Sequence, residues 1–281
     1  MKPTANNAGL LVTLLSACMA LSTACSHMGE CECGDEDEKS EHVKGKHHEE
    51  EREEKGEKEE DEEDEKEEHG AKNAAKADFS KDFGIAQRKL SPTGEAPFFI
   101  LKPGFQIVLA GPDGKVEITV LDKTQDIGGV TTRVVEEREW AKGEIEEISR
   151  NFFAIDEATK DVFYFGEEVD MYKNGKVVKN EGAWRADEPG NSAGLAIPGN
   201  PKVGDRFYME IAPGKALDRA EIVSLGETLV TPAGTFKDVV KTKETSGLNP
   251  AEKEFKHYAR GIGQIQDEDL LLTKYGYING K

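Results

Sequence analysis

The stretch FQIVLAGPDGKVEITVL, residues 105–121, decides the fold class. Its apolar residues Val116, Ile118 and Val120 recur with the period of two that is typical of a half-buried strand. Before them, the Gly-Pro-Asp-Gly sequence at residues 111–114 favours a tight turn back to residues 105–110. The stretch therefore predicts a β-hairpin.

Further hairpins are predicted downstream. Asn174 and Gly175 form the dipeptide most typical of a type I′ turn. This turn joins residues 169–172 to 176–178, and turns at 232–234 and 267–269 join residues 227–230 to 235–241 and 263–265 to 270–275. We expect an antiparallel arrangement in which each strand pairs with its neighbour in the sequence.

Other segments indicate where strands lie in the sheet. Residues 151–155 and 162–165 are apolar on both faces, so we expect them at its centre. In residues 206–211, an alternation predicts that the apolar members share one face; these are Phe207, Met209 and Ile211, alternating with Arg206, Tyr208 and Glu210. Residues 182–203 are rich in Gly and Pro and are expected to form a long loop, which is often a functional lid.

Roughly ten or more short strands joined by tight turns indicate an all-β fold, an antiparallel meander. Such a meander must cover or pair its edges, so we expect a curved sheet, a half-barrel or a barrel. The predicted organisation is a signal segment at 1–25, a tether at 26–78 and a β-rich domain at 79–281.

The N-terminus resembles a secretion signal. Lys2 precedes an apolar run at residues 9–21, which is too short to span a bilayer. Cys18 and Cys25 both lie in contexts that resemble the bacterial lipobox. Cys18 has a leucine three residues before it, whereas Cys25 follows the longer apolar core and leaves an even number of cysteines. We expect lipidation at one of them, with plain secretion as the alternative, and hence a location in the periplasm, on the outer membrane or outside the cell.

An acidic segment carries most of the net charge of −19. Residues 35–69 contribute about −13 of it, which leaves about −6 for the remaining chain. Low hydrophobicity with high charge cannot offset chain entropy, so we expect a disordered tether, with local helix at most. The basic density of a nucleic-acid binder is absent from the sequence, and we expect no such partner.

The N-terminal region also contains candidate metal ligands. Imidazole and thiolate groups suit Zn or Cu ions; the residues are His27, Cys31, Cys33, His47 and His48. Their spacing encodes no defined geometry. Weak binding of divalent metal is therefore an alternative function to a plain spacer, and no cofactor is predicted.

Four short motifs resemble those of an uncharacterised family of secreted or lipid-anchored bacterial β-rich proteins. They are NFFAI (151–155), YFGE (164–167), EGAW (181–184) and YARGIG (258–263). The closing motif also resembles a strand of half-barrel envelope proteins akin to the lipoprotein-localisation carriers, although Arg260 stands where that pattern has proline. The resemblance implies an envelope location and a β-rich fold, and it implies no activity.

No catalytic motif supports an enzyme. Nucleophilic catalysis requires a base within reach of the nucleophile, and His257 is the one histidine in the region predicted to fold. Paired acids would suit a carbohydrate-active enzyme, which is a further alternative; the candidates are Asp161, Glu167, Glu168, Asp170, Glu210, Asp218 and Glu221. We expect a protein without catalysis.

Aromatic side chains and one arginine are the candidate ligand-binding groups. Aromatic residues line pockets for apolar ligands, although they also form ordinary cores. Arg219, between two acids in the sequence, is a candidate either for a polar ligand or for ion pairs between strands. The candidates are Tyr164, Trp184, Tyr208, Arg219 and Tyr258, with Phe165 as a further aromatic lining residue. The sequence thus predicts binding or scaffolding in the envelope, with a lipophilic ligand held in a curved sheet as one form of it.

Overall fold

The computed structural model describes residues 78–278. Apart from one 3-10 turn, η1 (Ile85–Gln87), the regular structure of these residues is β. The strands are β1 (Leu90–Ser91), β2 (Gly94–Ala96), β3 (Phe99–Leu101), β4 (Phe105–Ala110), β5 (Gly114–Ile127), β6 (Val130–Ala141), β7 (Glu144–Asp156), β8 (Val162–Lys173), β9 (Lys176–Lys179), β10 (Trp184–Arg185), β11 (Ser192–Ile197), β12 (Arg206–Tyr208), β13 (Glu210–Ile211), β14 (Asp218–Thr231), β15 (Gly234–Ser246), β16 (Glu254–Ala259), β17 (Gly263–Asp267) and β18 (Leu270–Tyr277). The predicted all-β fold class is confirmed.

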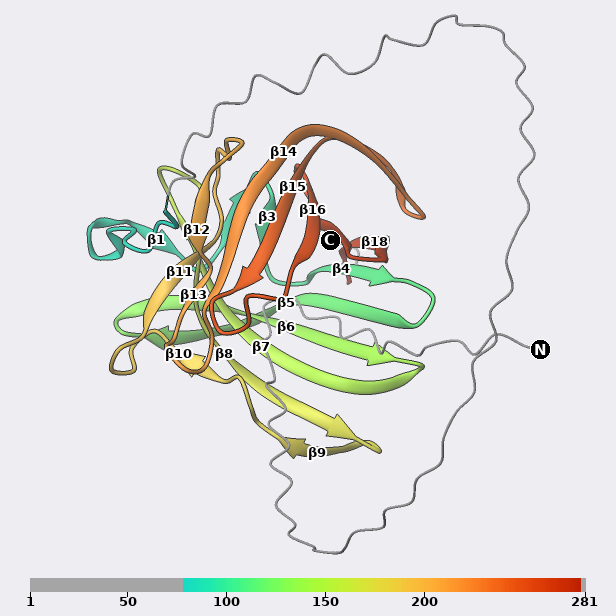
Figure 1. The fold of residues 1–281 in the computed structure, drawn as a ribbon, viewed down its shortest axis with the longest axis horizontal. Coiled ribbons are helices and arrows are strands. Elements are labelled where there is room, and N and C mark those ends of the chain that lie inside the picture. The colour runs from blue at the N-terminus through green and yellow to red at the C-terminus, as the bar shows by residue number, and fades with distance from the viewer. Residues whose placement is uncertain (1–77, 279–281) are drawn as a thin grey trace, which may run out of the picture. The chain divides into compact units, whose positions relative to one another are not determined.

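Most strands form one antiparallel sheet that curls round to meet itself (Figure 1). Its order is β12-β14-β15-β16-β17-β18-β4-β5-β6-β7-β8-β11-β13. The two ends of this order, β12 and β13, are consecutive in the chain and are separated by Met209 alone. β12 pairs with β14, and β13 pairs with β11. The sheet is therefore nearly closed into a barrel, and a single chain segment joins its two ends.

The predicted hairpins form at the predicted turns. Asn174 and Gly175, between β8 and β9, have φ angles of 53° and 70°, the positive pair that a type I′ turn requires. The turns at 111–113, 232–233 and 268–269 join β4 to β5, β14 to β15 and β17 to β18. Every residue of 151–155 and 162–165 is buried, as expected for the centre of the sheet.

The long loop predicted at residues 182–203 is partly wrong. This region contains β10, which pairs with β8, and β11, which pairs with β8 and β13. β11 has the sequence SAGLAI, whose small and apolar residues fit a strand buried on both faces. Its glycine is needed for close approach: a Cβ at Gly194 would lie 2.1 Å from the carbonyl oxygen of Met209. The glycine that suggested a loop thus allows β11 to pack closely against Met209, where the two ends of the sheet meet; this place is called the seam below.

The alternation predicted for residues 206–211 holds only as far as Met209. Phe207 and Met209 are buried as expected, but Glu210 is fully buried and Ile211 is half-buried. The strand is interrupted between β12 and β13, and the interruption shifts the face on which the following side chains lie. The expectation that Glu210 faces solvent is therefore wrong.

Antiparallel pairing gives the barrel two distinct ends. The β4–β5, β6–β7 and β17–β18 turns lie at one end, and the β5–β6, β7–β8 and β16–β17 turns lie at the other. The β2–β3 hairpin packs at this second end, where Gly261 donates a backbone hydrogen bond to the Pro97 carbonyl (2.7 Å) and Phe99 packs on Phe153 (4.9 Å between rings). Val120, Val135 and the other apolar residues here form a conventional core, called the apolar half below.

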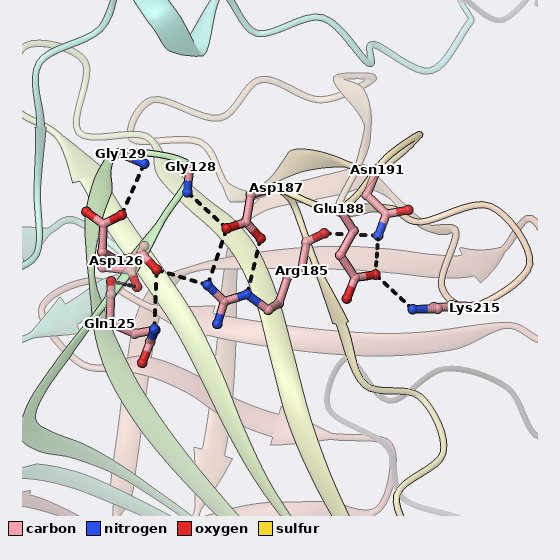
Figure 2. Close-up of polar contacts among 10 residues, drawn as sticks. Gln125, Asp126, Gly128, Gly129, Arg185, Asp187, Glu188, Asn191 and Lys215 are labelled. Carbon is pink, nitrogen blue, oxygen red and sulfur yellow. Dashed lines mark hydrogen bonds and ion pairs between the residues drawn. The ribbon is translucent and has the colours of Figure 1, made fainter.

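A polar clasp holds the β5–β6 turn to the segment that follows β10 (Figure 2). Arg185 donates hydrogen bonds to the Asp126 carbonyl (3.0 Å) and to Asp187 (3.1 Å). Asp187 in turn accepts a hydrogen bond from the Gly128 backbone (3.2 Å). These contacts use solvent-facing groups, so the clasp fixes the rim without involving the interior.

Candidate functional site

A cluster of acidic side chains lies in the barrel interior, toward the end with the β6–β7 and β17–β18 turns. Strand register places Glu139 opposite Glu147, and Lys256 opposite Asp267. All members are buried except Asp218, which is half-buried. We call this set the interior acid cluster; it comprises Glu137, Glu139, Glu147, Glu167, Glu210, Asp218, Glu244 and Asp267.

Lys256 on β16 is the cation within this cluster, and it is 1% exposed. Its Nζ lies 3.0 Å from Glu244, 3.7 Å from Glu254 and 3.8 Å from Asp267. Burial alone would lower the pKa of Lys256, but these three carboxylates raise it well above its ordinary value. The lysine therefore remains an ammonium ion in the interior.

One lysine does not balance the acids. Burial raises the pKa of Glu137, Glu139, Glu167 and Glu210 well above the ordinary value, and the neighbouring carboxylates raise it further. Burial likewise raises the pKa of Asp218 and of Asp267 to about 7. At neutral pH the cluster therefore holds protons that exposed carboxylates would have released.

Several buried polar atoms have no hydrogen-bond partner among the described residues. Both carboxylate oxygens of Glu210 are in this position, as are Oε1 of Glu137 and Oε1 of Glu167. The donor groups Nε2 of Gln264 and Nε1 of Trp184 are unpaired as well. A buried polar group without a partner costs about 1–3 kcal/mol, so these atoms mark the interior as a place for a further hydrogen-bonding group.

A cavity of about 60 Å³ lies where the interior acid cluster meets the apolar half. Its polar lining groups include Glu137, Asn151 and Gln264, while most of its surface is apolar. Ile107, Phe153 and other side chains from β3, β4, β5 and β11 supply the apolar part. The cavity thus combines a carboxylate with a hydrophobic wall.

An aromatic stack adjoins this cavity. Phe153 stacks on Tyr164 at 4.8 Å, and Tyr164 meets Trp184 edge to face at 5.4 Å. The Tyr164 hydroxyl donates a 2.6 Å hydrogen bond to Oδ1 of Asn151. The stack therefore fixes the orientation of a polar side chain that lines the cavity.

The structure separates the five predicted ligand-binding residues into two groups. Tyr164, Trp184 and Tyr258 are buried in the interior, and Tyr258 lines the cavity. Tyr208 and Arg219 are half-buried and pack near Phe79 instead, with the Arg219 guanidinium 4.7 Å from that ring. The alternation in β12 and β14 sets these two side chains on the opposite face from the buried Phe207 and Ala220.

Phe165, the further aromatic candidate, is buried and lines a separate surface cleft between residues 81–92 and the β5–β6 turn. Within residues 78–278, the candidates of the catalytic alternatives lie in several separate places. His257 lies 3.2 Å from Glu227 through its Nε2, and burial lowers its pKa. Of the acids proposed for a carbohydrate-active enzyme, Glu167, Glu210 and Asp218 belong to the interior acid cluster. The others form ordinary surface contacts or are exposed: Asp161 and Asp170 accept hydrogen bonds from Arg88 and Arg150, Glu221 lies 3.6 Å from Arg206, and Glu168 is exposed.

The predicted lipidation and metal residues fall outside the part of the chain that the structure describes. These are Cys18, Cys25, His27, Cys31, Cys33, His47 and His48. Within residues 78–278, no group of three or more His, Cys, Asp or Glu side chains is arranged to hold a metal ion. The same residues contain no helix with the length and apolar character needed to cross a membrane.

Sequence reasoning missed most of the interior acid cluster. Glu137 and Glu139 lie in the run VVEEREW, where charged residues occupy both faces of the strand and hide the alternation. Lys256 and Asp267 were equally unremarkable in sequence. A register counted back from the β5–β6 turn would have placed Glu139 opposite Ile118, whereas the register shift between Val120 and Thr124 places Glu137 there. The sequence therefore offered no signal for this pairing.

Comparison with known proteins gives little help. No family model matches the chain, and no curated protein matches it. Among solved structures, the chain is similar to the crystal structure of a "putative lipoprotein" from Parabacteroides distasonis, with a TM-score of 0.32 and 12% sequence identity. The match covers 66% of this chain and 100% of that one. A likeness this weak assigns no family, so the motif resemblance stays a prediction.

Proposed function

We propose that this chain is an envelope-located binding protein without catalytic activity, and that its barrel interior holds a small ligand. The observation that carries this proposal is the cavity beside Glu137 and Gln264, both of which are buried and leave a polar atom unpaired within the described residues. A ligand that supplies the missing partner recovers the cost of burying such atoms, about 1–3 kcal/mol each. The strands of the nearly closed barrel supply the wall around it.

The location belongs to the same proposal. A lipid on Cys25, or on Cys18, anchors the chain to a membrane, and segment 26–78 spaces the β-rich domain at 79–281 from that surface. Fifty residues of flexible chain reach roughly 40 Å, and the acidic charge keeps the segment from lying on anionic lipid. The observations that support this are the apolar signal-like run and the position of the acidic segment after it.

The cavity favours a small ligand over a lipid. A lipophilic ligand held by the sheet was one sequence prediction, and it stays a prediction. The cavity of about 60 Å³ is well below the roughly 150 Å³ of a cavity that admits benzene, so an acyl chain would require the barrel to expand. Metal binding by the N-terminal Cys and His residues and a carbohydrate-active site also stay predictions.

Native mass spectrometry of the full chain purified from bacterial membranes tests this function. We expect a retained small molecule that is lost after unfolding and refolding. Replacing Cys25 by Ser should release the protein from the membrane fraction, with Cys18→Ser as the matched variant. A protein that carries no bound molecule and binds none from an envelope extract would contradict ligand binding, and an unmodified cysteine in both positions would contradict the anchor.

A further inference from the structure

The interior acid cluster already accommodates one ammonium ion. Lys256 Nζ is held by Glu244 at 3.0 Å, with Glu254 and Asp267 within 4 Å. Glu254 is 28% exposed at the rim, so this half of the cluster reaches from solvent into the interior. The chain itself therefore shows which chemical group these carboxylates hold.

Carboxylate oxygens in the other half of the cluster have no such contact within the described residues, although the charge of Lys256 also acts on Glu137 and Glu210. Glu137, Glu167 and Glu210 leave carboxylate oxygens that receive no hydrogen bond from residues 78–278. Glu137 is 3% exposed, lines the cavity and has an unpaired Oε1. A buried carboxylate oxygen that can accept a hydrogen bond from a ligand thus lines this cavity.

Most of the rest of the cavity wall is apolar, and it therefore favours a cation that carries a small apolar group. Ile107, Ile118 and Phe153 line the space together with the Tyr258 ring. An apolar wall disfavours a fully hydrated ion, whereas aromatic faces attract an organic cation. The volume of about 60 Å³ is less than half of the roughly 150 Å³ of a cavity that admits benzene, which limits the ligand to a few heavy atoms.

We propose that this cavity binds a short alkylammonium ion, with the ammonium group hydrogen-bonded to Glu137 and the alkyl group against Ile107, Ile118 and Phe153. This assignment rests on the proposed function, that the barrel interior is a binding site, and it names the ligand class. The ligand's ammonium group would contact Glu137 as the ammonium group of Lys256 contacts Glu244.

Binding of this cation must be coupled to proton release. Burial keeps Glu137 protonated to a higher pH than an exposed glutamate, and the groups that act on it are Lys256, Asp267, Glu147 and Glu139. The ammonium ion pairs with the ionised carboxylate, so the proton leaves as the ligand enters. The affinity therefore rises with pH as Glu137 releases its proton, until the amine itself loses its own proton.

Calorimetric titration of the full chain with ethylammonium chloride tests the proposal. Ethanol serves as a neutral ligand of similar size, and calcium chloride as a compact inorganic cation. We expect ethylammonium to bind and ethanol not to bind. Glu137→Gln should weaken ethylammonium binding about tenfold or more, the value of one hydrogen bond to a charged group. Glu146→Gln removes the same charge from an exposed site on β7 and should leave the affinity unchanged.

Glu137→Gln is expected to fold, because it removes a carboxylate that gains no hydrogen bond at Oε1. Ile118→Phe, which fills the cavity, provides a second variant that should abolish binding while leaving every charge in place. Binding of calcium without ethylammonium overturns the ligand class. If native mass spectrometry finds another retained molecule while ethylammonium fails to bind, this assignment fails and the proposed function stands. If nothing binds, both fail.

Discussion

The two ends of the barrel interior bury different kinds of side chain: one end is apolar and the other is acidic. The apolar half packs side chains such as Val120, Val135 and Phe153, and the β2–β3 hairpin covers it. The acidic half places seven buried carboxyl groups and the half-buried Asp218 around Lys256. Apolar packing stabilises a fold directly, whereas a buried carboxylate repays its desolvation only through a partner. The first half therefore explains why the barrel is stable, whereas the second carries a cost of burial that the proposed ligand would offset.

The largest effect should follow removal of the internal cation. Lys256→Met leaves Glu244 and Asp267 without their ion-pair partner, and breaking a buried pair from one side costs about 3–5 kcal/mol. Urea denaturation at pH 8 measures the loss, and it should diminish at pH 5, where Asp267, with a pKa of about 7, takes up a proton. Lys253→Met, at an exposed site immediately before β16, should change stability by less than about 0.5 kcal/mol. Equal losses in the two variants would remove the distinction between the halves.

A smaller loss is expected in the apolar half. Ile107→Ala removes buried methyl groups beside the cavity and should cost about 2–4 kcal/mol. No titratable group is removed, so urea denaturation should give the same loss at pH 5 and at pH 8. A loss that grows with pH, as expected for Lys256→Met, would show that Ile107 is energetically part of the acid cluster.

The smallest of the three effects has the opposite sign. Glu210 is fully buried and neither of its carboxylate oxygens meets a donor among residues 78–278. Glu210→Leu replaces it by an apolar side chain of similar size and should stabilise the protein by about 1–3 kcal/mol at pH 8. Glu168→Leu, an exposed position on β8, is the matched control. Destabilisation by Glu210→Leu in thermal melts would mean that this carboxylate already has a partner.

The two halves also differ in how far the sequence predicts them. Turn residues such as Asn174 and Gly175 fix hairpins locally, and apolar alternation in residues 116–120 assigns a face, so the barrel walls could be anticipated. The seam, where β11 packs against Met209, could not be predicted. Gly194 is typical of a loop, and its close contact with Met209 is known only from the structure.

The interior acid cluster could not be predicted from the sequence for a related reason. Its members come from β6, β7, β8, β13, β14, β15 and β17, and their meeting depends on barrel closure and on the break at Met209 that turns Glu210 inward. Strands with charge on both faces carry no alternation from which to infer an interior. The aromatic candidates Tyr164, Trp184 and Tyr258 were found because aromatic residues stand out in any strand; their function could not be read from the same pattern.

The acid cluster has a defined consequence for stability against pH. Asp218 and Asp267 have a pKa of about 7 in the folded chain, against an ordinary value of 3.8. Between about pH 4 and pH 7 the folded chain therefore binds more protons than the unfolded chain, and its stability falls as pH rises. The buried glutamates, with pKa values raised by burial, act in the same direction. His257, whose pKa burial lowers, acts in the opposite direction below its ordinary pKa.

The free energy of unfolding in urea, measured from pH 4.5 to pH 8, tests most directly whether the buried acids lack sufficient partners. In the absence of added ligand, we predict that it decreases steadily over this range, and that the double variant Asp218→Asn/Asp267→Asn flattens the decrease. His257→Gln should steepen the decrease. A free energy of unfolding that stays constant or increases toward pH 8 would contradict the account, because it would mean that the interior carboxylates are fully paired within the folded chain.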